Sequence, residues 1–99
     1  MTKFDELITG NKPVLVDFYA EWCGPCKAMA PILKEVKSVV GDAVTVIKVD
    51  VDRNNVVASK YNVRGVPTLI LFRAGKQVWR QSGVVPATQI IQVLQSQST

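Results

Sequence analysis

A short apolar run followed at once by a long amphipathic segment constrains the fold of this chain most strongly. Residues 13–20 contain Val14-Leu15-Val16 and Phe18, with a single charge at Asp17. Near-continuous apolar runs of this length are typical of strands that are covered on both faces. Between Met29 and Val40 the apolar residues recur three or one positions apart, which predicts one buried stripe on a helix. The sequence therefore predicts a strand that leads directly into a long helix.

The rest of the chain continues the alternation of strands and helices. The expected elements are a strand at 44–51, a short helix capped by Asp52 and running to about Tyr61, strands at 68–72 and 77–81 joined around Ala74-Gly75, and a helix beginning at Pro86. This order predicts an α/β fold in which a mixed sheet of about four strands is flanked by helices.

Length and composition exclude several classes of protein. The 99 residues predict a single domain spanning 1–99, and no apolar run approaches the roughly 20 residues that cross a bilayer. The absence of histidine excludes His-based triads and His metal sites. The 12 basic and 8 acidic residues give a net charge of +4, but the basic residues are scattered and predict no nucleic-acid partner. The N-terminus lacks the apolar stretch of a secretory signal, which predicts an intracellular protein.

The only two cysteines lie between the expected first strand and the long helix, in the run Trp22-Cys23-Gly24-Pro25-Cys26-Lys27. Backbone N–H groups at a helix start are unpaired and carry partial positive charge. A thiolate on Cys23 is stabilised there, which predicts a lowered pKa for this thiol. Cys26 lies three positions later on nearly the same helical face, close to the first sulfur. Cys23 can therefore attack a target disulfide, and Cys26 can then release the mixed disulfide.

Two other uses of a Cys-x-x-Cys pair compete with this redox chemistry. A structural disulfide would close a very small loop with little entropic effect, and the expected reducing compartment opposes it. A zinc site needs four ligands, which only a dimer sharing Cys23 and Cys26 would supply. We therefore expect redox chemistry with no metal and no bound cofactor.

Asp17 is the second informative residue. A carboxylate between apolar neighbours is costly to bury unless it is paired or protonated, and desolvation raises its pKa. Because Asp17 lies six residues before Cys23, near the expected helix start, it can accept the proton of Cys26. The alternative is a carboxylate at the sheet edge that faces water. Lys48, a charge inside the second apolar strand, either pairs with Asp17 or extends to solvent.

The Trp22–Lys27 run, together with Val66-Pro67-Thr68 and Asp17, closely resembles the thioredoxin family. The resemblance extends from Val14 through the final helix. It implies that Cys23 is the attacking nucleophile, Cys26 the resolving thiol and Asp17 the proton acceptor, with Lys48 as its nearby partner. It also implies a cis peptide bond at Pro67 and a backbone contact between Val66 and bound peptide. The implied docking surface consists of Trp22, Gly24, Pro25, Val66, Pro67, Gly83 and Val84.

The chain departs from the family pattern in two places. Tyr19 stands where the family usually has Trp, so the packing under the site is expected to differ. The family's first strand is missing, so residues 3–9 are expected to form a first helix with Phe4, Leu7 and Ile8 packing inward. The second strand of the chain then becomes a sheet edge with an uncovered row of backbone groups.

The resemblance implies a cytoplasmic protein-disulfide reductase, in which the Cys23–Cys26 pair cycles between dithiol and disulfide. Such a protein carries electrons in cell redox homeostasis. The implied partners are disulfide-containing protein substrates and a thioredoxin reductase, with no nucleic acid, no membrane and a monomeric chain. The Gly24-Pro25 pair resembles that of the reducing members of the family.

Overall fold

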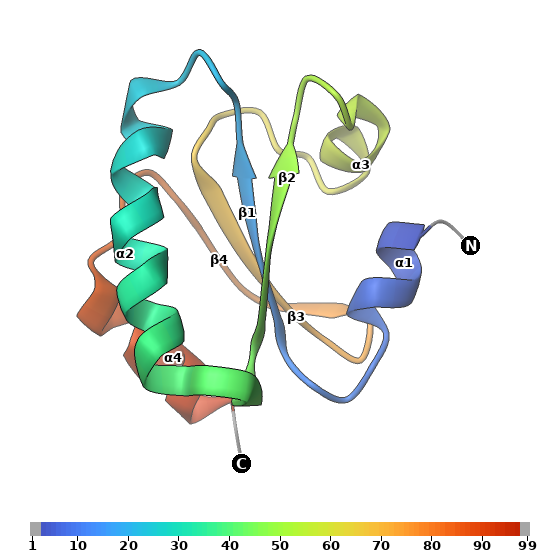
Figure 1. Cartoon of the computed structure of the whole chain (residues 1–99). Helices are drawn as coiled ribbons and strands as arrows, with labels where there is room; N and C mark the ends of the chain where they lie inside the picture. The colour runs from blue at the N-terminus through green and yellow to red at the C-terminus, as the bar shows by residue number, and fades with distance from the viewer. Residues whose placement is uncertain (1–2, 98–99) are drawn as a thin grey trace.

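The sheet carries apolar side chains on both of its faces, and helices cover each face (Figure 1). The computed structural model describes residues 3–97. The elements in chain order are α1 (Lys3–Ile8), β1 (Val14–Tyr19), α2 (Gly24–Val40), the short 3₁₀ helix η1 (Gly41–Ala43), β2 (Thr45–Asp50), α3 (Asn55–Lys60), β3 (Thr68–Arg73), β4 (Lys76–Ser82) and α4 (Ala87–Ser96).

The strand order is β2-β1-β3-β4, with β1 and β2 parallel and the other neighbours antiparallel. The predicted mixed four-stranded sheet is therefore confirmed, and β2 lies at an edge as expected. The parallel register places Val14 beside Thr45 and Tyr19 beside Asp50. Because β1 and β2 run in the same direction, the loops that follow them meet at one end of the sheet (Figure 1).

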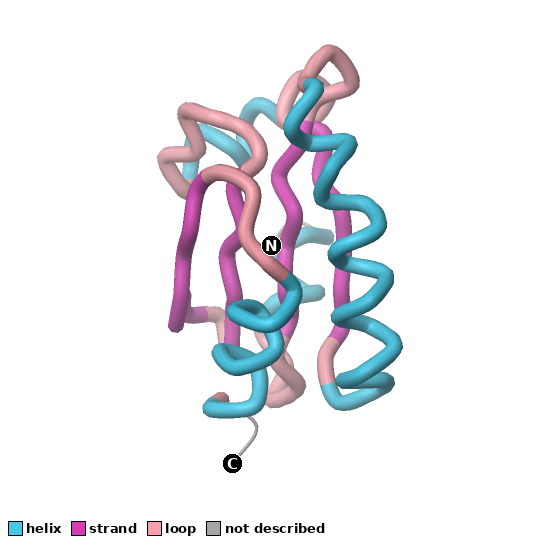
Figure 2. Tube along the Cα trace, turned by 90° about the vertical axis from the view of Figure 1, so that its left-hand side faces the viewer, coloured by secondary structure: helices cyan, strands magenta, loops and turns pink. Residues whose placement is uncertain are grey.

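Alternation along the strands separates two cores. Leu15 on β1 and Leu71 on β3 lie in one core with Met29 of α2 and Ile90 of α4. The intervening strand residues face the opposite side, where Phe18 packs in a second core with α1. Figure 2 shows α2 and α4 in front of the strands, with the remaining helices behind them. Asp17 and Tyr19 share the α2 side of β1 with Leu15.

The first helix exists as expected, but it buries fewer side chains than predicted. Phe4 and Ile8 are buried, and the Phe4 ring meets Phe72 edge-on at 5.8 Å between centroids. Leu7 is 47% exposed, so the expectation that it packs inward is wrong. Successive residues of a helix are about 100° apart, and a six-residue helix on the sheet surface buries only a narrow stripe. Leu7 lies at the border of that stripe.

The third helix begins later than predicted. Asn54, rather than Asp52, occupies the N-cap position of α3. Asp50 Oδ1 accepts hydrogen bonds from the backbone N–H groups of Asp52 and Arg53, which forms a turn before the helix. The N-cap of this helix is therefore two positions later than expected, and Asp50 organises the turn before it.

An arginine on the edge strand β4 fastens the loop that follows α3. The Arg80 guanidinium donates hydrogen bonds to the carbonyl oxygens of Tyr61 and Asn62. This loop leads directly to the segment that contains Pro67.

Among residues 3–97, no helix has the length and apolar character required to cross a membrane.

Candidate active site

The two cysteines are joined by a disulfide at the first turn of α2. Their Cα atoms are 5.3 Å apart, which lies within the ordinary range for disulfides. The backbone N–H of Cys23 donates to the carbonyl of Ala20, forming the turn that leaves β1. Cys23 is the N-cap of α2, and the N–H of Cys26 donates to Cys23 Sγ at 3.1 Å. A thiolate at Cys23 would be stabilised by this N–H and by the helix dipole.

Both cysteines are almost fully buried, whereas the residues around them are exposed. The exposed fractions of Cys23 and Cys26 are 3% and 7%. Trp22 is 72% exposed, and Gly24 and Pro25 are also exposed. A reacting disulfide must therefore come into close contact with this rim to reach either sulfur.

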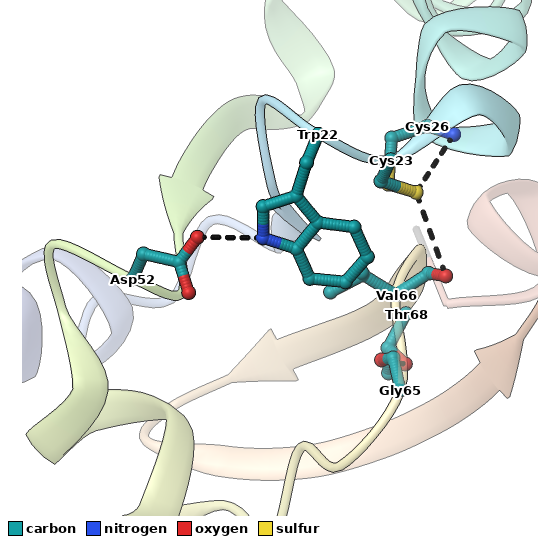
Figure 3. The surroundings of a disulfide bond; sticks show 7 residues. All are labelled: Trp22, Cys23, Cys26, Asp52, Gly65, Val66 and Thr68. Atoms are coloured by element: carbon teal, nitrogen blue, oxygen red, sulfur yellow. Dashed lines mark hydrogen bonds between the residues drawn. A yellow bond between two sulfur atoms is a disulfide. The ribbon is translucent and has the colours of Figure 1, made fainter.

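The loop before β3 lies against the disulfide. The Val66–Pro67 peptide bond is cis, which confirms the expectation taken from the family resemblance. The carbonyl oxygen of Val66 is 3.6 Å from Cys23 Sγ (Figure 3). Thr68 Oγ1 donates to the carbonyl of Gly65 at 2.7 Å and closes the loop. The backbone N–H of Val66 donates no hydrogen bond to any acceptor within residues 3–97, so it is available to a partner.

The segment after β4 joins the same surface. The N–H of Gly83 donates to the carbonyl of Pro67 at 2.9 Å, and Val84 is 48% exposed. Pro67 itself is buried. The structure therefore brings together the residues of the implied docking surface from three separate parts of the chain.

A hydrogen bond that the sequence analysis missed holds the exposed tryptophan. The Trp22 indole Nε1 donates to Asp52 Oδ2 at 2.8 Å (Figure 3). Nearby, Arg53 and Glu21 form an ion pair at 3.7 Å, so the loops after β1 and β2 are linked twice. Trp22 and Asp52 are 30 residues apart in sequence. Only the parallel pairing of β1 with β2 indicates that they meet.

Asp17 is buried on the α2 side of the sheet. It is 1% exposed, and neither carboxylate oxygen has a hydrogen-bond partner among the described residues. Burial raises the pKa of Asp17 to about 6, and the positive charge of Lys48 opposes this rise. The alternative of a carboxylate that faces water at the sheet edge is therefore wrong.

Lys48 lies beside Asp17 in the strand register but forms no ion pair with it among the described residues. Its side chain is exposed, and its Nζ lies over the Tyr19 ring, 4.6 Å from the ring centroid. A pocket of about 310 Å³ opens next to these groups. Its lining residues are Tyr19, Ala20, Glu21, Cys26, Lys27, Ala30 and Lys48.

A zinc site that two copies of the chain share is another use of the cysteine pair that the sequence leaves open. In the part of the chain that the structure describes, no group of three or more His, Cys, Asp or Glu side chains is arranged to hold a metal ion. The two sulfurs are instead bonded to each other.

Comparisons with known proteins agree on one family. The Thioredoxin family model matches residues 1–96. The thioredoxin-like protein slr0233 of Synechocystis sp. is 50% identical over 93 residues, which cover 93% of this chain and 89% of the relative. Thioredoxin Y of rice, named as chloroplastic, is 47% identical over 96 residues, covering 96% of this chain. The chain spans 57% of the length of that relative.

Solved structures show the same relationship. A mutant thioredoxin from Halobacterium salinarum NRC-1 superimposes with a TM-score of 0.89 at 38% identity, covering 100% of this chain and 86% of the other. A thioredoxin from Malassezia sympodialis gives a TM-score of 0.88 at 32% identity, covering 97% of this chain and 84% of the other.

Proposed function

The chain belongs to the thioredoxin family, and on this premise we propose that it is a thiol–disulfide oxidoreductase that reduces protein disulfides. The observation that carries the proposal is the Cys23–Cys26 disulfide at the amide-rich start of α2, beside the cis-proline loop. The two cysteines lie three positions apart within one helical turn, so the chain holds their sulfurs close together.

In the proposed reaction, the Cys23 thiolate attacks one sulfur of a substrate disulfide. The substrate S–S bond breaks, one substrate cysteine leaves as a thiolate, and a mixed disulfide forms with Cys23. Cys26 then loses its proton and attacks Cys23 Sγ, which releases the second substrate thiolate. The substrate gains two electrons, and the protein is left with the Cys23–Cys26 disulfide. A separate reductase returns the two electrons.

Cys23 is assigned as the nucleophile because of two contacts. Its sulfur accepts the N–H of Cys26 at the helix start, an arrangement that favours a thiolate. Its sulfur also lies 3.6 Å from the Val66 carbonyl, in the loop that the substrate is proposed to contact. The open N–H of Val66 supports the proposal that an extended substrate peptide pairs with this backbone. Exposed Trp22 and Val84 supply apolar surface for such a peptide.

Asp17 is assigned as the acceptor of the Cys26 proton. A carboxylate whose pKa is about 6 is mostly charged at neutral pH, yet it binds a proton more readily than an exposed aspartate does. Its lack of any hydrogen-bond partner among residues 3–97 leaves both oxygens available for this proton.

The remaining assignments follow from this chemistry. We propose that residues 1–99 form one thioredoxin domain that acts as a monomer, with no cofactor besides its own disulfide. Its partners are disulfide-containing proteins and a thioredoxin reductase, and neither nucleic acid nor a membrane takes part. We also propose a cytoplasmic location, because thiols are kept reduced there. Electron transport and redox homeostasis are the corresponding cellular roles.

The direct test is the reduction of insulin by dithiothreitol, followed as turbidity. The parent protein should accelerate the reaction, Cys23→Ser should abolish the acceleration, and Cys26→Ser should accumulate a mixed disulfide that mass spectrometry detects. An unaccelerated reaction with the parent protein, or full activity of Cys23→Ser, would contradict the proposal.

The role of Asp17 needs a separate measurement. Asp17→Asn should slow release of the mixed disulfide near neutral pH and leave the first attack by Cys23 nearly unchanged. Equal slowing of both steps would show that Asp17 does not act on the Cys26 proton.

A further inference from the structure

We propose that Tyr19 is a positioning residue: its ring holds the Lys48 ammonium at the mouth of the pocket beside Cys26, within electrostatic reach of Asp17. This inference deepens the proposed function, because it rests on the role of Asp17 in releasing the mixed disulfide. Tyr19 acts through Lys48, and its side chain also packs against the cluster of Ala20, Cys23 and Cys26.

The sheet register brings the three groups together. Asp17 on β1 is paired with Lys48 on β2, and Tyr19 follows two positions after Asp17. Because side chains alternate along a strand, all three lie on the face covered by α2. The Lys48 Nζ is 4.6 Å from the centroid of the Tyr19 ring, a distance at which an aromatic face attracts a cation.

The ammonium lies against the ring because a contact with the buried carboxylate would require it to leave water completely. Loss of hydration can exceed the attraction between two buried charges. Over the ring, the Lys48 ammonium keeps an exposed position and still gains a favourable contact. The structure agrees with this balance, because no ion pair joins Lys48 to Asp17 in the described chain. Lys48 nevertheless opposes the rise in the pKa of Asp17 that burial causes.

Other charged groups near the pocket do not replace Lys48. Lys27 of α2 and Glu21 of the preceding loop line the pocket with opposite charges. Asp50 at the end of β2 accepts two backbone N–H groups in its own turn. Across β3, the residue paired with Asp17 is the apolar Leu69. Cys26 of α2, which also lines the pocket, is the proton donor of the proposed reaction.

The ring therefore has a measurable consequence. Without it, the ammonium moves outward into water and acts less strongly on Asp17. We expect the pKa of Asp17 to rise by about half a unit, which roughly halves its charged fraction near pH 6. Release of the mixed disulfide should slow by about twofold at that pH and much less at higher pH.

The experiment compares Tyr19→Leu, which removes the ring, with Tyr19→Phe and Tyr19→Trp, which keep an aromatic face. Each reduced protein is mixed in a stopped-flow instrument with a chromogenic aryl disulfide from about pH 5 to about pH 8. The first burst of aryl thiolate reports attack by Cys23, and the second reports release by Cys26. Tyr19→Leu should shift the pH profile of the second burst toward higher pH and leave the rate of the first burst unchanged. Tyr19→Phe and Tyr19→Trp should give the same pH profile as the parent protein.

A second background isolates the contact with Lys48. In Lys48→Met the cation is already absent, so adding Tyr19→Leu should produce no further shift. NMR titration of the Asp17 carboxyl carbon in the oxidised protein measures the same shift without any reaction. A shift of equal size in the Lys48→Met background, or an equal shift with Tyr19→Phe, would overturn the inference. Absence of a second burst in the parent protein would instead refute the proposed function, and the NMR titration would still test the Tyr19–Lys48 contact.

Discussion

Replacing the buried Asp17 with Asn should stabilise the fold at neutral pH and leave its stability nearly unchanged in acid. Asn has almost the same shape as Asp but carries no charge. In the parent protein the charged carboxylate lies among apolar groups with no hydrogen-bond partner among the described residues. Burial of that charge opposes folding.

The size of the effect follows from the pKa of Asp17. Its value in the folded chain is about 6, against an ordinary value of 3.8. At about 1.4 kcal/mol for each pH unit, this difference corresponds to about 3 kcal/mol. Because the folded state holds the proton more tightly, the unfolded state binds fewer protons between these two values. The free energy of unfolding contributed by Asp17 therefore falls as pH rises from 3.8 to about 6, and stays low above that.

Urea unfolding of the oxidised protein measures this contribution. The difference in unfolding free energy between Asp17→Asn and the parent should be small near pH 4 and grow to about 3 kcal/mol near pH 8. For a domain of this size, the gain at neutral pH corresponds to a rise in Tm of roughly 10 °C or more. Asp42→Asn, which changes an exposed acid in η1, serves as the matched control and should show little change at either pH.

The pH dependence of the difference in unfolding free energy tests whether burial of the Asp17 charge is its cause. A difference between Asp17→Asn and the parent that stays constant from about pH 4 to about pH 8 would refute the reasoning, because charge burial must vanish when the acid is protonated. A parent protein that is more stable than Asp17→Asn at about pH 8 would refute it as well.

Three further predictions concern the backbone and the thiols. Gly83→Ala should lower the free energy of unfolding by about 1 kcal/mol, because a residue with a Cβ is strained at the φ of +88°. The added Cβ meets no atom within 4 Å, so backbone strain is the expected cost, and Gly10→Ala should not destabilise. Equal urea midpoints for the two variants would count against this. Arg80→Ala should cost about 1–2 kcal/mol through loss of two hydrogen bonds to the loop after α3, and Arg80→Lys should recover less than half; an unchanged midpoint for Arg80→Ala would be inconsistent with that clamp. In the reduced protein at neutral pH, iodoacetamide should modify Cys23 at least tenfold faster than Cys26, measured by peptide mass spectrometry; similar rates would argue against the assignment of Cys23.

Much of the fold follows from local patterns. The apolar run at Val14, the helical stripe that ends before Gly41 and the turn at Gly75 depend on the side-chain periods of strands and helices, which act over a few residues. The cysteine pair at a helix start is equally local, because Cys23 and Cys26 lie within one turn. The wrong predictions for Asp52 and Leu7 also have local causes. Asn54 takes the N-cap position of α3 after a turn that Asp50 organises, and Leu7 lies at the border of a short helical stripe.

The sequence by itself determined the order of elements, the two apolar faces of the sheet and the redox pair. The tertiary structure alone left Lys48 exposed, with its ammonium over the Tyr19 ring and no ion pair to Asp17 among the described residues, and joined Trp22 to Asp52. It also placed the Val66 backbone against Cys23, 43 residues earlier in the chain. These contacts depend on the register of β1 with β2 and on loop closure across the sheet. Local residue patterns carry no information about which distant partners such packing selects.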